Sequence, residues 1–515
     1  MRLAFLIVVL VPSWAFAEPN LRQEDPRVDS AAEVIELSVE PAPLPSPLLK
    51  YRFWPSAAET RRGNAALPIA TATGQHQMLQ ANWINAIGTE RAWSDDKHIL
   101  LAVERLNELD WAEELSVEDL KLARRLMGAS SHQVFIPIDE AAGNDFADWG
   151  HWDLVRNESL QKVIETLLPV QQESRSVARY LELKFRLAVY EGNVPEAVKA
   201  LRTQFRLGYH IANSPFIVSR LVGAAICSEA VDACPYLIQK GGGKNFYYAF
   251  ATLPDPLIDF KPAIEAEFGL AQRAAGWPDR DKFDDLNETQ WRANYLSRSR
   301  DLLDGGYSSG WNISELARSN SALRNLEVGL YVGLRAALQY PRAKKILIDE
   351  GIDQAKIDDM PVGEVIARVQ YEATQRLLQG ELAKLYLAPH RHETKARTGI
   401  NSLTAAEAFV TIPPAIRLLS PATAQIRHSG VRLDAKIAAL KTIEALRAYA
   451  AAEGSWPESL DDIKIVPVPE NPRTGRPFSY RLEGGVAVLE AAISSRAKLN
   501  KVYRLRLIDT EKESD

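Results

Sequence analysis

The spacing of apolar residues restricts the fold more than any other feature of this sequence. From about residue 75 to 415, apolar residues recur every three or four positions, as in Val177–Tyr190, Leu323–Leu338 and Ile366–Leu387. This spacing gathers apolar side chains on one face of an α-helix. Alternation typical of strands is nearly absent there, except in Val134–Ile138, a β-branched run that could be a short strand or an extended connector. The sequence therefore predicts a mainly α protein with a helical domain over residues 74–415.

One pair of predicted helices forms a clear hairpin. The first helix ends near Tyr190, Gly192-Asn193 turns the chain, and Pro195 lies in the first turn of the second helix, where proline is tolerated. The two facing stripes consist of Leu183, Leu187 and Tyr190 on one helix and Ala197, Leu201 and Phe205 on the other. The pattern resembles a tetratricopeptide-type (TPR-like) hairpin, but repeat arrays need about three or more units and one is evident. The body is thus expected to be an irregular helical-hairpin solenoid or a non-repetitive bundle.

The last hundred residues have a different pattern. A long helix is predicted to run to about Ala452 and to end at Gly454, with an apolar stripe at Leu433, Ile437, Leu440, Ile443 and Leu446. Three strands are predicted after it, at Phe478–Leu482, Val486–Ala491 and Val502–Ile508, with Gly484-Gly485 forming a tight hairpin. We expect residues 416–515 to form a small α+β module, a long helix plus a three-stranded antiparallel sheet.

The N-terminal end indicates export. Arg2 precedes the apolar run Leu3–Val11, and Ala15-Phe16-Ala17 places small residues where signal peptidase cleaves. We expect residues 1–17 to be a signal peptide cleaved after Ala17, and the mature protein to lie in the periplasm, in the cell envelope or outside the cell. Residues 18–73 are expected to form an extended Pro-rich N-terminal arm, because prolines alternate with other residues from Pro41 to Pro47.

Charge and hydropathy narrow the possible partners. The formal net charge is -6, and basic pairs such as Arg61-Arg62 are short and scattered, so nucleic acid is not an expected partner. No later segment is expected to span a membrane, because the most apolar one, Phe216–Val231, is interrupted by Arg220, Ser228 and Glu229.

The two cysteines, Cys227 and Cys234, leave two interpretations open. In a continuous helix, seven residues separate their Cα atoms by roughly 10 Å, which is beyond the reach of a disulfide. Pro235 and Gly241–Gly243 could instead end the helix early and allow a disulfide, which an exported protein tolerates.

Three motifs suggest chemistry but lack what that chemistry requires. Gly306–Gly310 fits G-x-S-x-G, yet a nucleophile elbow needs a strand before it and a parallel sheet around it. His390–Glu393 offers two histidines, but no further cluster completes a zinc site. Gly241–Lys244 is followed by Asn245 where a phosphate-binding loop requires Ser or Thr. A turn or an exposed loop accounts for each.

Other candidate residues also have simpler explanations. The acidic pairs Asp95-Asp96, Asp358-Asp359 and Asp461-Asp462 lie at predicted helix starts or turns, where carboxylates accept bonds from free amides. Trp149 and Trp152, with His151 between them, could line a carbohydrate platform, although tryptophans at this spacing usually belong to a core. The sequence therefore indicates no catalytic residue, no metal ligand and no cofactor.

The C-terminal module resembles the soluble part of type II secretion pseudopilins. The resemblance is carried by Ile443–Tyr449, Gly454, Trp456–Leu460, Asn471-Pro472, Thr474-Gly475, Pro477-Phe478 and Tyr480. It implies a pilin-like fold over roughly residues 433–492. The processed N-terminal pilin helix is missing, and Ser494-Ser495-Arg496 replaces the acidic calcium-binding loop of major pseudopilins.

The whole chain also resembles a family of exported bacterial helical proteins whose activity is uncharacterised. The matching segments are Leu48–Arg52, Gly63–Ala66, Asn245–Ala249, Leu253-Pro254 and Met360–Val362. This resemblance implies export and a helical body joined to the pseudopilin-like module. It implies no activity.

Two kinds of function remain. The sequence favours a non-enzymatic envelope protein, a helical scaffold or protein-interaction module whose partner is a protein or peptide, since helical arrays bind partners through their surfaces. The alternatives are an exported enzyme, such as a hydrolase of envelope polymers with a site assembled from distant residues, and an accessory component of a type II-like secretion system.

Overall fold

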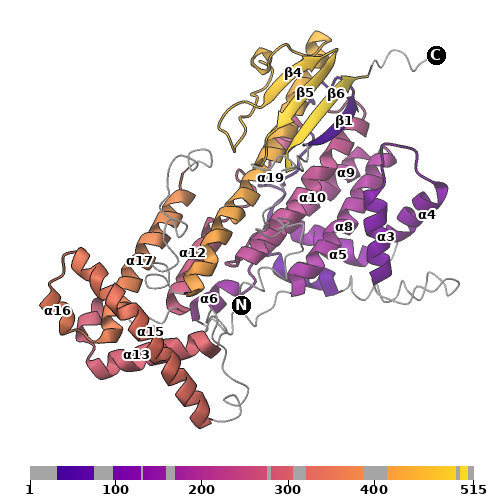
Figure 1. Cartoon of the computed structure of the whole chain (residues 1–515). Helices are drawn as coiled ribbons and strands as arrows, with labels where there is room; N and C mark the ends of the chain where they lie inside the picture. Colours follow the sequence, from indigo (N-terminus) through magenta and orange to yellow (C-terminus); the bar gives the residue numbers. More distant parts are fainter. Residues whose placement is uncertain are drawn as a thin grey trace, which may run out of the picture. The chain divides into compact units, whose positions relative to one another are not determined.

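The protein is mainly α-helical and carries one small mixed sheet of four strands (Figure 1). The computed structural model describes residues 32–74, 97–128, 132–157, 169–274, 280–304, 321–387, 414–494 and 499–508. The expected signal peptide, residues 1–17, lies outside these ranges.

The chain divides into two compact units. Of the described residues, the first contains 152–157, 261–274, 280–304, 321–387 and 414–426, and the second contains 32–74, 97–128, 132–151, 169–260, 427–494 and 499–508. The divisions therefore fall elsewhere than at residues 73 and 415, and the second unit contains both the start of the helical body and the C-terminal module.

The second unit is built around three successive helices. These are α8 (Pro169–Tyr190), α9 (Val194–Ala212) and α10 (Ile217–Lys240), which pack side by side (Figure 1). Between α8 and α9, Gly192 adopts a φ of 72°, and the side chain of Asn193 accepts a hydrogen bond from the amide of Glu196. The predicted helical hairpin is present, with Pro195 in the first turn of α9.

Shorter elements complete this unit. They are α3 (Lys97–Glu108), α4 (Val117–Leu126), α5 (His132–Gly143), α11 (Tyr247–Ala251), a helix over residues 66–74, and the paired strands β2 (Arg61–Asn64) and β3 (Asn144–Phe146). α6 (His151–Asn157) begins at the boundary of the two units.

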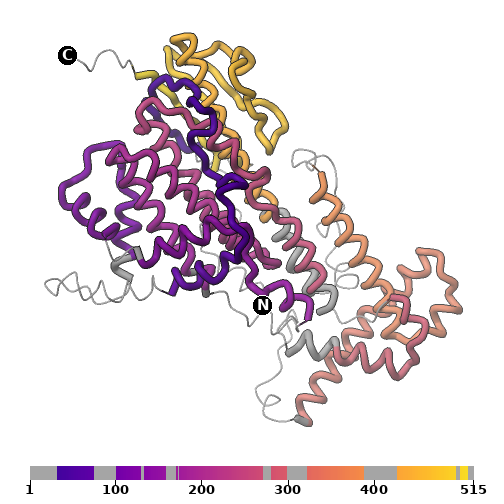
Figure 2. Tube along the Cα trace, turned by 180° about the vertical axis from the view of Figure 1, so that it is seen from behind, coloured from indigo at the N-terminus to yellow at the C-terminus, as the bar shows by residue number. Residues whose placement is uncertain are grey.

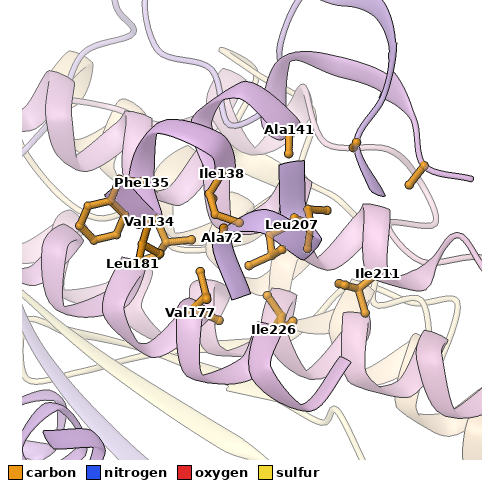
Figure 3. Close-up of a cluster of buried hydrophobic side chains, with 14 of the residues drawn as sticks. Ala72, Val134, Phe135, Ile138, Ala141, Val177, Leu181, Leu207, Ile211 and Ile226 are labelled. Carbon is orange, nitrogen blue, oxygen red and sulfur yellow. The ribbon is translucent and has the colours of Figure 1, made fainter. Parts of the chain in front are cut away.

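The run Val134–Ile138 is neither a strand nor an extended connector, because it lies within helix α5. Val134, Ile138 and Ala141 follow one another at helical spacing and point into a core shared with α8, α9 and α10 (Figure 3). Burial against three helices outweighs the β preference of branched side chains, which measures packing more than backbone preference.

The four-stranded sheet contains strands from both ends of the described chain. Its strands are β1 (Glu33–Val39), β4 (Ser479–Glu483), β5 (Val486–Ala491) and β6 (Lys501–Leu507), in the order β1-β6-β5-β4. The three antiparallel strands predicted from the sequence are present, and Gly484 and Gly485 turn between β4 and β5 with positive φ.

The prediction of a three-stranded sheet was incomplete, because β1 adds a fourth strand parallel to β6. Leu37 and Val39 of β1 are buried, whereas Glu36 and Ser38 are exposed. Figures 1 and 2 show β1, in indigo, beside the yellow strands of the C-terminal end. The N-terminal arm is therefore part of the second unit's sheet.

The long predicted helix is α19 (Pro414–Glu453), which ends at Gly454 with a φ of 73°. Its residues from Arg427 onward belong to the second unit. Leu433, Leu440, Ile443 and Leu446 are buried there, as the stripe predicts. Lys436 bonds Asp232 and Ser228 of α10, so this part of α19 lies against α10.

A buried ion pair joins three distant segments of the second unit. Glu444 and Arg447 of α19 have fully buried side chains 2.8 Å apart. Arg447 donates to the carbonyls of Glu40 (3.0 Å) and Lys244 (3.1 Å), and Glu444 accepts from the amide of Phe246 at 2.9 Å. Burial raises the pKa of Glu444, against the attraction of Arg447. A buried ion pair is stable only when its other donors and acceptors are also hydrogen-bonded. Backbone groups of the arm and of the segment after α10 supply most of these hydrogen bonds.

The same segments are held together by an amide and by aromatic rings. The side-chain NH2 of Asn245 donates to the carbonyls of Ala42 (3.0 Å) and Glu444 (2.8 Å). Tyr51 and Phe53 of the arm lie 5.2 and 6.3 Å from the ring of Phe246, between ring centroids. Ala42, Tyr51 and Phe53 of the arm therefore pack into the body, whereas residues 46–50 are exposed.

The first unit contains a separate group of helices. They are α12 (Lys261–Ala274), α13 (Glu288–Asp304), α15 (Ser321–Asp349), α16 (Gln354–Asp358) and α17 (Val362–Leu385). α15 packs on α13 and α17 through a core that includes Ala343, Leu347, Val365 and Val369. Phe283, in the 3-10 helix Arg280–Asp285, packs against Trp291 in a second small core.

Removing one partner of the buried pair should destabilise the second unit strongly. Arg447→Met leaves the Glu444 carboxylate buried without its cation, and we expect a loss of about 3–5 kcal/mol in the free energy of unfolding. Urea denaturation followed by circular dichroism measures this. Arg124→Met, at an exposed ion pair with Glu191, is the control and should cost less than about 1 kcal/mol. Equal effects of the two substitutions would contradict the assigned role.

Candidate protein-binding face

Several candidates from the sequence lie outside the described residues. These are the cleavage position after Ala17, Asp95-Asp96, Gly306–Gly310 and His390–Glu393. The structure gives no geometry for them.

The segment Gly241–Lys244 is a helix-ending turn. α10 ends at Gly241, and Gly242 and Gly243 adopt φ values of 65° and 64°, a conformation that side chains with a Cβ rarely adopt. The Lys244 amine folds back and donates to the carbonyl of Gly241 at 3.0 Å. The turn thus presents Lys244 and Asn245 to the buried pair of α19, which accounts for its glycines.

Trp149 and His151 are packed against one another instead of forming an open platform. The Trp149 indole N–H donates to the carbonyl of His210 at 2.9 Å, and its ring stacks on His151 with centroids 6.3 Å apart. Trp152 belongs to the first unit, where Arg156 lies over its ring. One face of Trp149 is therefore already occupied by His151.

His151 also contacts a serine, and that pair does not form a nucleophile. Its Nδ1 lies 3.0 Å from the hydroxyl of Ser214, and burial lowers the pKa of His151 to about 4. Ser214 is fully buried, and its hydroxyl accepts the amide of Phe216 at the start of α10. The arrangement closes the turn between α9 and α10 and leaves the serine out of a substrate's reach.

The described acidic pairs hold local structure. Asp358 forms an ion pair with Lys344, and Asp462 accepts from the amide of Ser459 in a capping box. Of the described residues, no group of three or more His, Cys, Asp or Glu is arranged to hold a metal ion.

Cys227 and Cys234 are both buried free thiols. α10 continues through both positions and through Pro235, so the early helix end that a disulfide requires does not occur. Burial raises the pKa of both thiols, which keeps them protonated.

A cluster of buried charged groups lies along α8 and α10, and no sequence motif indicated it. Burial, together with the neighbouring Glu182, raises the pKa of Glu229 to about 7. One of its carboxylate oxygens is buried and has no hydrogen-bond partner among the described residues. The raised pKa of this carboxylate makes the free energy of unfolding depend on pH.

The neighbouring Asp232 is paired and more exposed. Lys436 of α19 and Lys501 of β6 lie 2.6 and 2.9 Å from its carboxylate. Although burial opposes ionisation, these two cations hold the pKa of Asp232 below its ordinary value. The cluster thus fastens the C-terminal module to α10.

α10 has the length and composition of a membrane span. Its most apolar window has a mean hydropathy of 1.5, and 72% of that window is buried inside the protein. The sequence suggests that Arg220, Ser228 and Glu229 interrupt such a span, but the helix passes by length and composition in spite of them. Burial on this scale fits a helix at the centre of a folded body.

The outward face of α15 is the most extensive apolar surface of a single described helix. Four leucines spaced four residues apart, Leu326, Leu330, Leu334 and Leu338, are 51–60% exposed. Beside them runs a second row of Gly329, Gly333, Ala337 and Pro341, all exposed. Positions four residues apart form ridges and grooves on a helix, so a leucine ridge lies beside a shallow groove of small residues. We call these eight residues the leucine face.

The opposite side of α15 packs against the other helices of the first unit. Val328 and Val332 are buried there, together with the polar residues Arg335 and Gln339. Tyr295 of α13 donates its hydroxyl hydrogen to the amide oxygen of Gln339 at 3.0 Å. The helix therefore has two apolar sides, and the described residues of the unit cover only one of them.

Comparison of the chain with protein-family models, with curated proteins and with solved structures finds no match. The geometry of the described residues is therefore the basis for any statement about function.

The two thiols should react only when α10 unfolds. We expect no reaction of the native protein with a thiol-reactive dye, and two reacting thiols per chain in denaturant without reductant. Absorbance after addition of the dye measures the count. Fewer than two thiols in the denatured, unreduced protein would contradict the free-thiol assignment.

Glu229 should make stability depend on pH. Its pKa is raised from 4.5 to about 7 on folding, so the folded state binds the proton more tightly than the unfolded state does. Stability is therefore lost as pH rises from about 5 to 8, by roughly 3 kcal/mol for a shift of this size. In Glu229→Gln most of this loss should disappear, as measured by urea denaturation at pH 5 and 8. Glu118→Gln, at an exposed position of α4, is the control, and equal pH dependence in both variants would contradict the prediction.

Proposed function

We propose that this protein is a non-enzymatic, exported helical scaffold that binds a helix of a partner protein through the leucine face of α15. One observation carries the proposal: a ridge of four half-exposed leucines beside a groove of small residues. Contiguous apolar patches of a few hundred Å2 mark interaction sites on folded proteins.

The shape of the leucine face favours a helix as the bound element. No atom of the described residues lies within 4 Å of where a Cβ of Gly329 or Gly333 would stand, so a partner backbone has room to approach. A ridge of one helix packs into such a groove of another, which is the ordinary way in which helices associate. An extended peptide has no ridge at this spacing.

The C-terminal module has a different role in this proposal. Its helix is fixed to the arm and to α10 by the Glu444–Arg447 pair and by Lys436. The long helix, the turn at Gly454 and the antiparallel strands support the pseudopilin-like interpretation. We propose that the module is a structural cap of the second unit, and that the first unit carries the binding surface.

The proposal predicts that charge on the leucine face abolishes partner binding. We expect the full-length protein, purified from gently solubilised cell envelope, to retain a stoichiometric partner that the double variant Leu330→Glu/Leu334→Glu loses. A carboxylate buried in an apolar contact lacks a compensating cation, which disfavours binding. Mass spectrometry of the purified material measures this.

Leu67→Glu is the matched control, because Leu67 is 74% exposed on a helix of the second unit. Circular dichroism of each variant checks that the fold is retained. The same partner at the same stoichiometry on all three proteins would exclude the leucine face as the binding surface.

A further inference from the structure

The segment that follows α10, residues 244–260, lies along α19, and we call it the strap. Near its start, the Glu444 carboxylate of α19 accepts the amide of Phe246 at 2.9 Å. Near its end, the amide of Leu257 donates to a carboxylate oxygen of Asp434 at 3.2 Å. Residue numbers rise along the strap while they fall along α19, so the two segments run antiparallel within the second unit.

The end of the strap is packed on α19 as well as bonded to it. Leu257, Ile258 and Phe260 are buried. A Cβ at Gly430 of α19 would stand 3.2 Å from the ring of Phe260, so this glycine allows the strap to lie close. Asp434 follows Gly430 by four residues and therefore lies on the same side of the helix. The contact at Gly430 and the hydrogen bond to Asp434 thus act on the same few residues.

The two ends of the strap differ in the charges that hold them. At the first end, the Glu444 carboxylate is balanced by Arg447, 2.8 Å away. At the second end, Asp434 is half-buried, and the described groups that act on its charge include no basic side chain. A carboxylate removed from water without a cation is unfavourable, so burial favours its neutral form. The second end is therefore held best when Asp434 carries a proton.

The groups that face Asp434 from the strap and from α10 agree with this direction. Burial raises the pKa of Asp434 to about 7; the amide of the strap opposes this shift, and the charge of the exposed Asp255 adds to it. A second acidic residue of the strap, Asp259, is attracted to Arg220 of α10. The nearby Cys227 of α10 is a buried thiol whose raised pKa keeps it neutral.

The neighbouring cations of α19 itself have other partners. Arg432 and Lys436 stand two positions before and after Asp434, which places them about 200° around the helix. Arg432 donates to the hydroxyl of Ser429 at 3.1 Å, and Lys436 bonds Asp232 of α10. The charge of Asp434 is thus left to the amide of the strap.

The second end of the strap is also the place where the chain leaves the second unit. After Phe260 the chain continues into α12 of the first unit, and it returns to the second unit at Arg427 of α19. Both passages lie within a few residues of the contact between Phe260 and Gly430. Release of the strap at Asp434 therefore loosens the point from which α12 continues.

We propose that Asp434 is a pH-dependent latch, whose protonated form holds residues 253–260 against α19 and whose ionised form releases them. This device is independent of the leucine face.

The sign of the pH dependence follows from the two states of the latch. In the released strap Asp434 has its ordinary pKa of 3.8, and in the closed strap its pKa is about 7. The closed state therefore binds the proton more tightly. The hold is complete below about pH 4 and is lost progressively as pH rises to about 7.

Hydrogen exchange resolved by peptide measures the opening of the strap in the full-length protein. Between pH 5 and 8, after correction for the intrinsic exchange rate, the opening of residues 253–260 should become about tenfold or more populated. In Asp434→Asn the side-chain oxygen still accepts the amide of Leu257 but carries no charge, so this dependence should disappear. The same pH dependence in this variant, or none in the unaltered protein, would overturn the latch.

Two further variants separate the latch from a general loss of stability. Asp255→Asn removes the repelling charge, so the pH at which opening levels off should move down. A merely structural role of Asp255 would not move it. Glu118→Gln, at an exposed position of α4, should leave the profile unchanged. Residues 181–201 of the α8–α9 hairpin are the internal reference, and an equal change there would show global opening and overturn the proposal.

Discussion

The Glu444–Arg447 pair is the interaction on which the architecture of the second unit depends. Both side chains are fully buried, and a protein interior admits charges only when they are paired and hydrogen-bonded. Their bonds reach the N-terminal arm, the turn after α10 and the amide of Phe246. Because each of these segments is held by the same two side chains, none can be displaced without exposing a charge to an apolar interior. This requirement selects one arrangement among the many that apolar packing alone would tolerate.

The two units place different demands on their helices. Most of α10 is buried, and it carries Glu229 with a raised pKa and Asp232 paired with two lysines. Within the part of the chain that the structure describes, α15 is covered on one side, and this side carries Arg335 and Gln339. The same side also buries Val328, Val332 and Leu347, so α15 has an apolar covered side and, opposite to it, a row of exposed leucines.

Much of the local structure was predictable from the sequence, because helical spacing and turn residues act over short distances. The α8–α9 hairpin, the end of α19 at Gly454 and the three antiparallel strands follow from such signals. The helical state of Val134–Ile138 does not follow from such signals. Its branched residues are held in a helix by packing against three other helices, which lie far away in the sequence. The strand β1 was missed because its alternation covers only Ile35, Leu37 and Val39 and its partner lies at the far end of the chain.

The sequence predicts the apolar residues of the candidate site but not their exposure. The run Leu323–Leu338 predicts a helix with an apolar face, and the natural interpretation is that this face is buried. The helix has two apolar sides, one with leucines and one with Val328 and Val332, and both can be read from the sequence. Which side faces its own unit depends on α13 and α17, and helical spacing alone does not determine that. The Asp232, Lys436 and Lys501 cluster was likewise beyond local patterns, because its members come from three separate elements.

The pairing of β1 with β6 has a consequence for the synthesis of the chain. Glu33 is aligned with Lys501, so the first strand of the sheet is made long before its neighbour exists. Throughout that interval β1 presents unpaired amides and carbonyls, a template that other extended chains can occupy. Bringing β1 and β6 together closes a long loop, which is entropically unfavourable. Only the hydrogen bonds and packing of the complete sheet compensate for this cost. The second unit thus reaches its final state only after the last strand has emerged, and β1 needs protection from premature pairing until then.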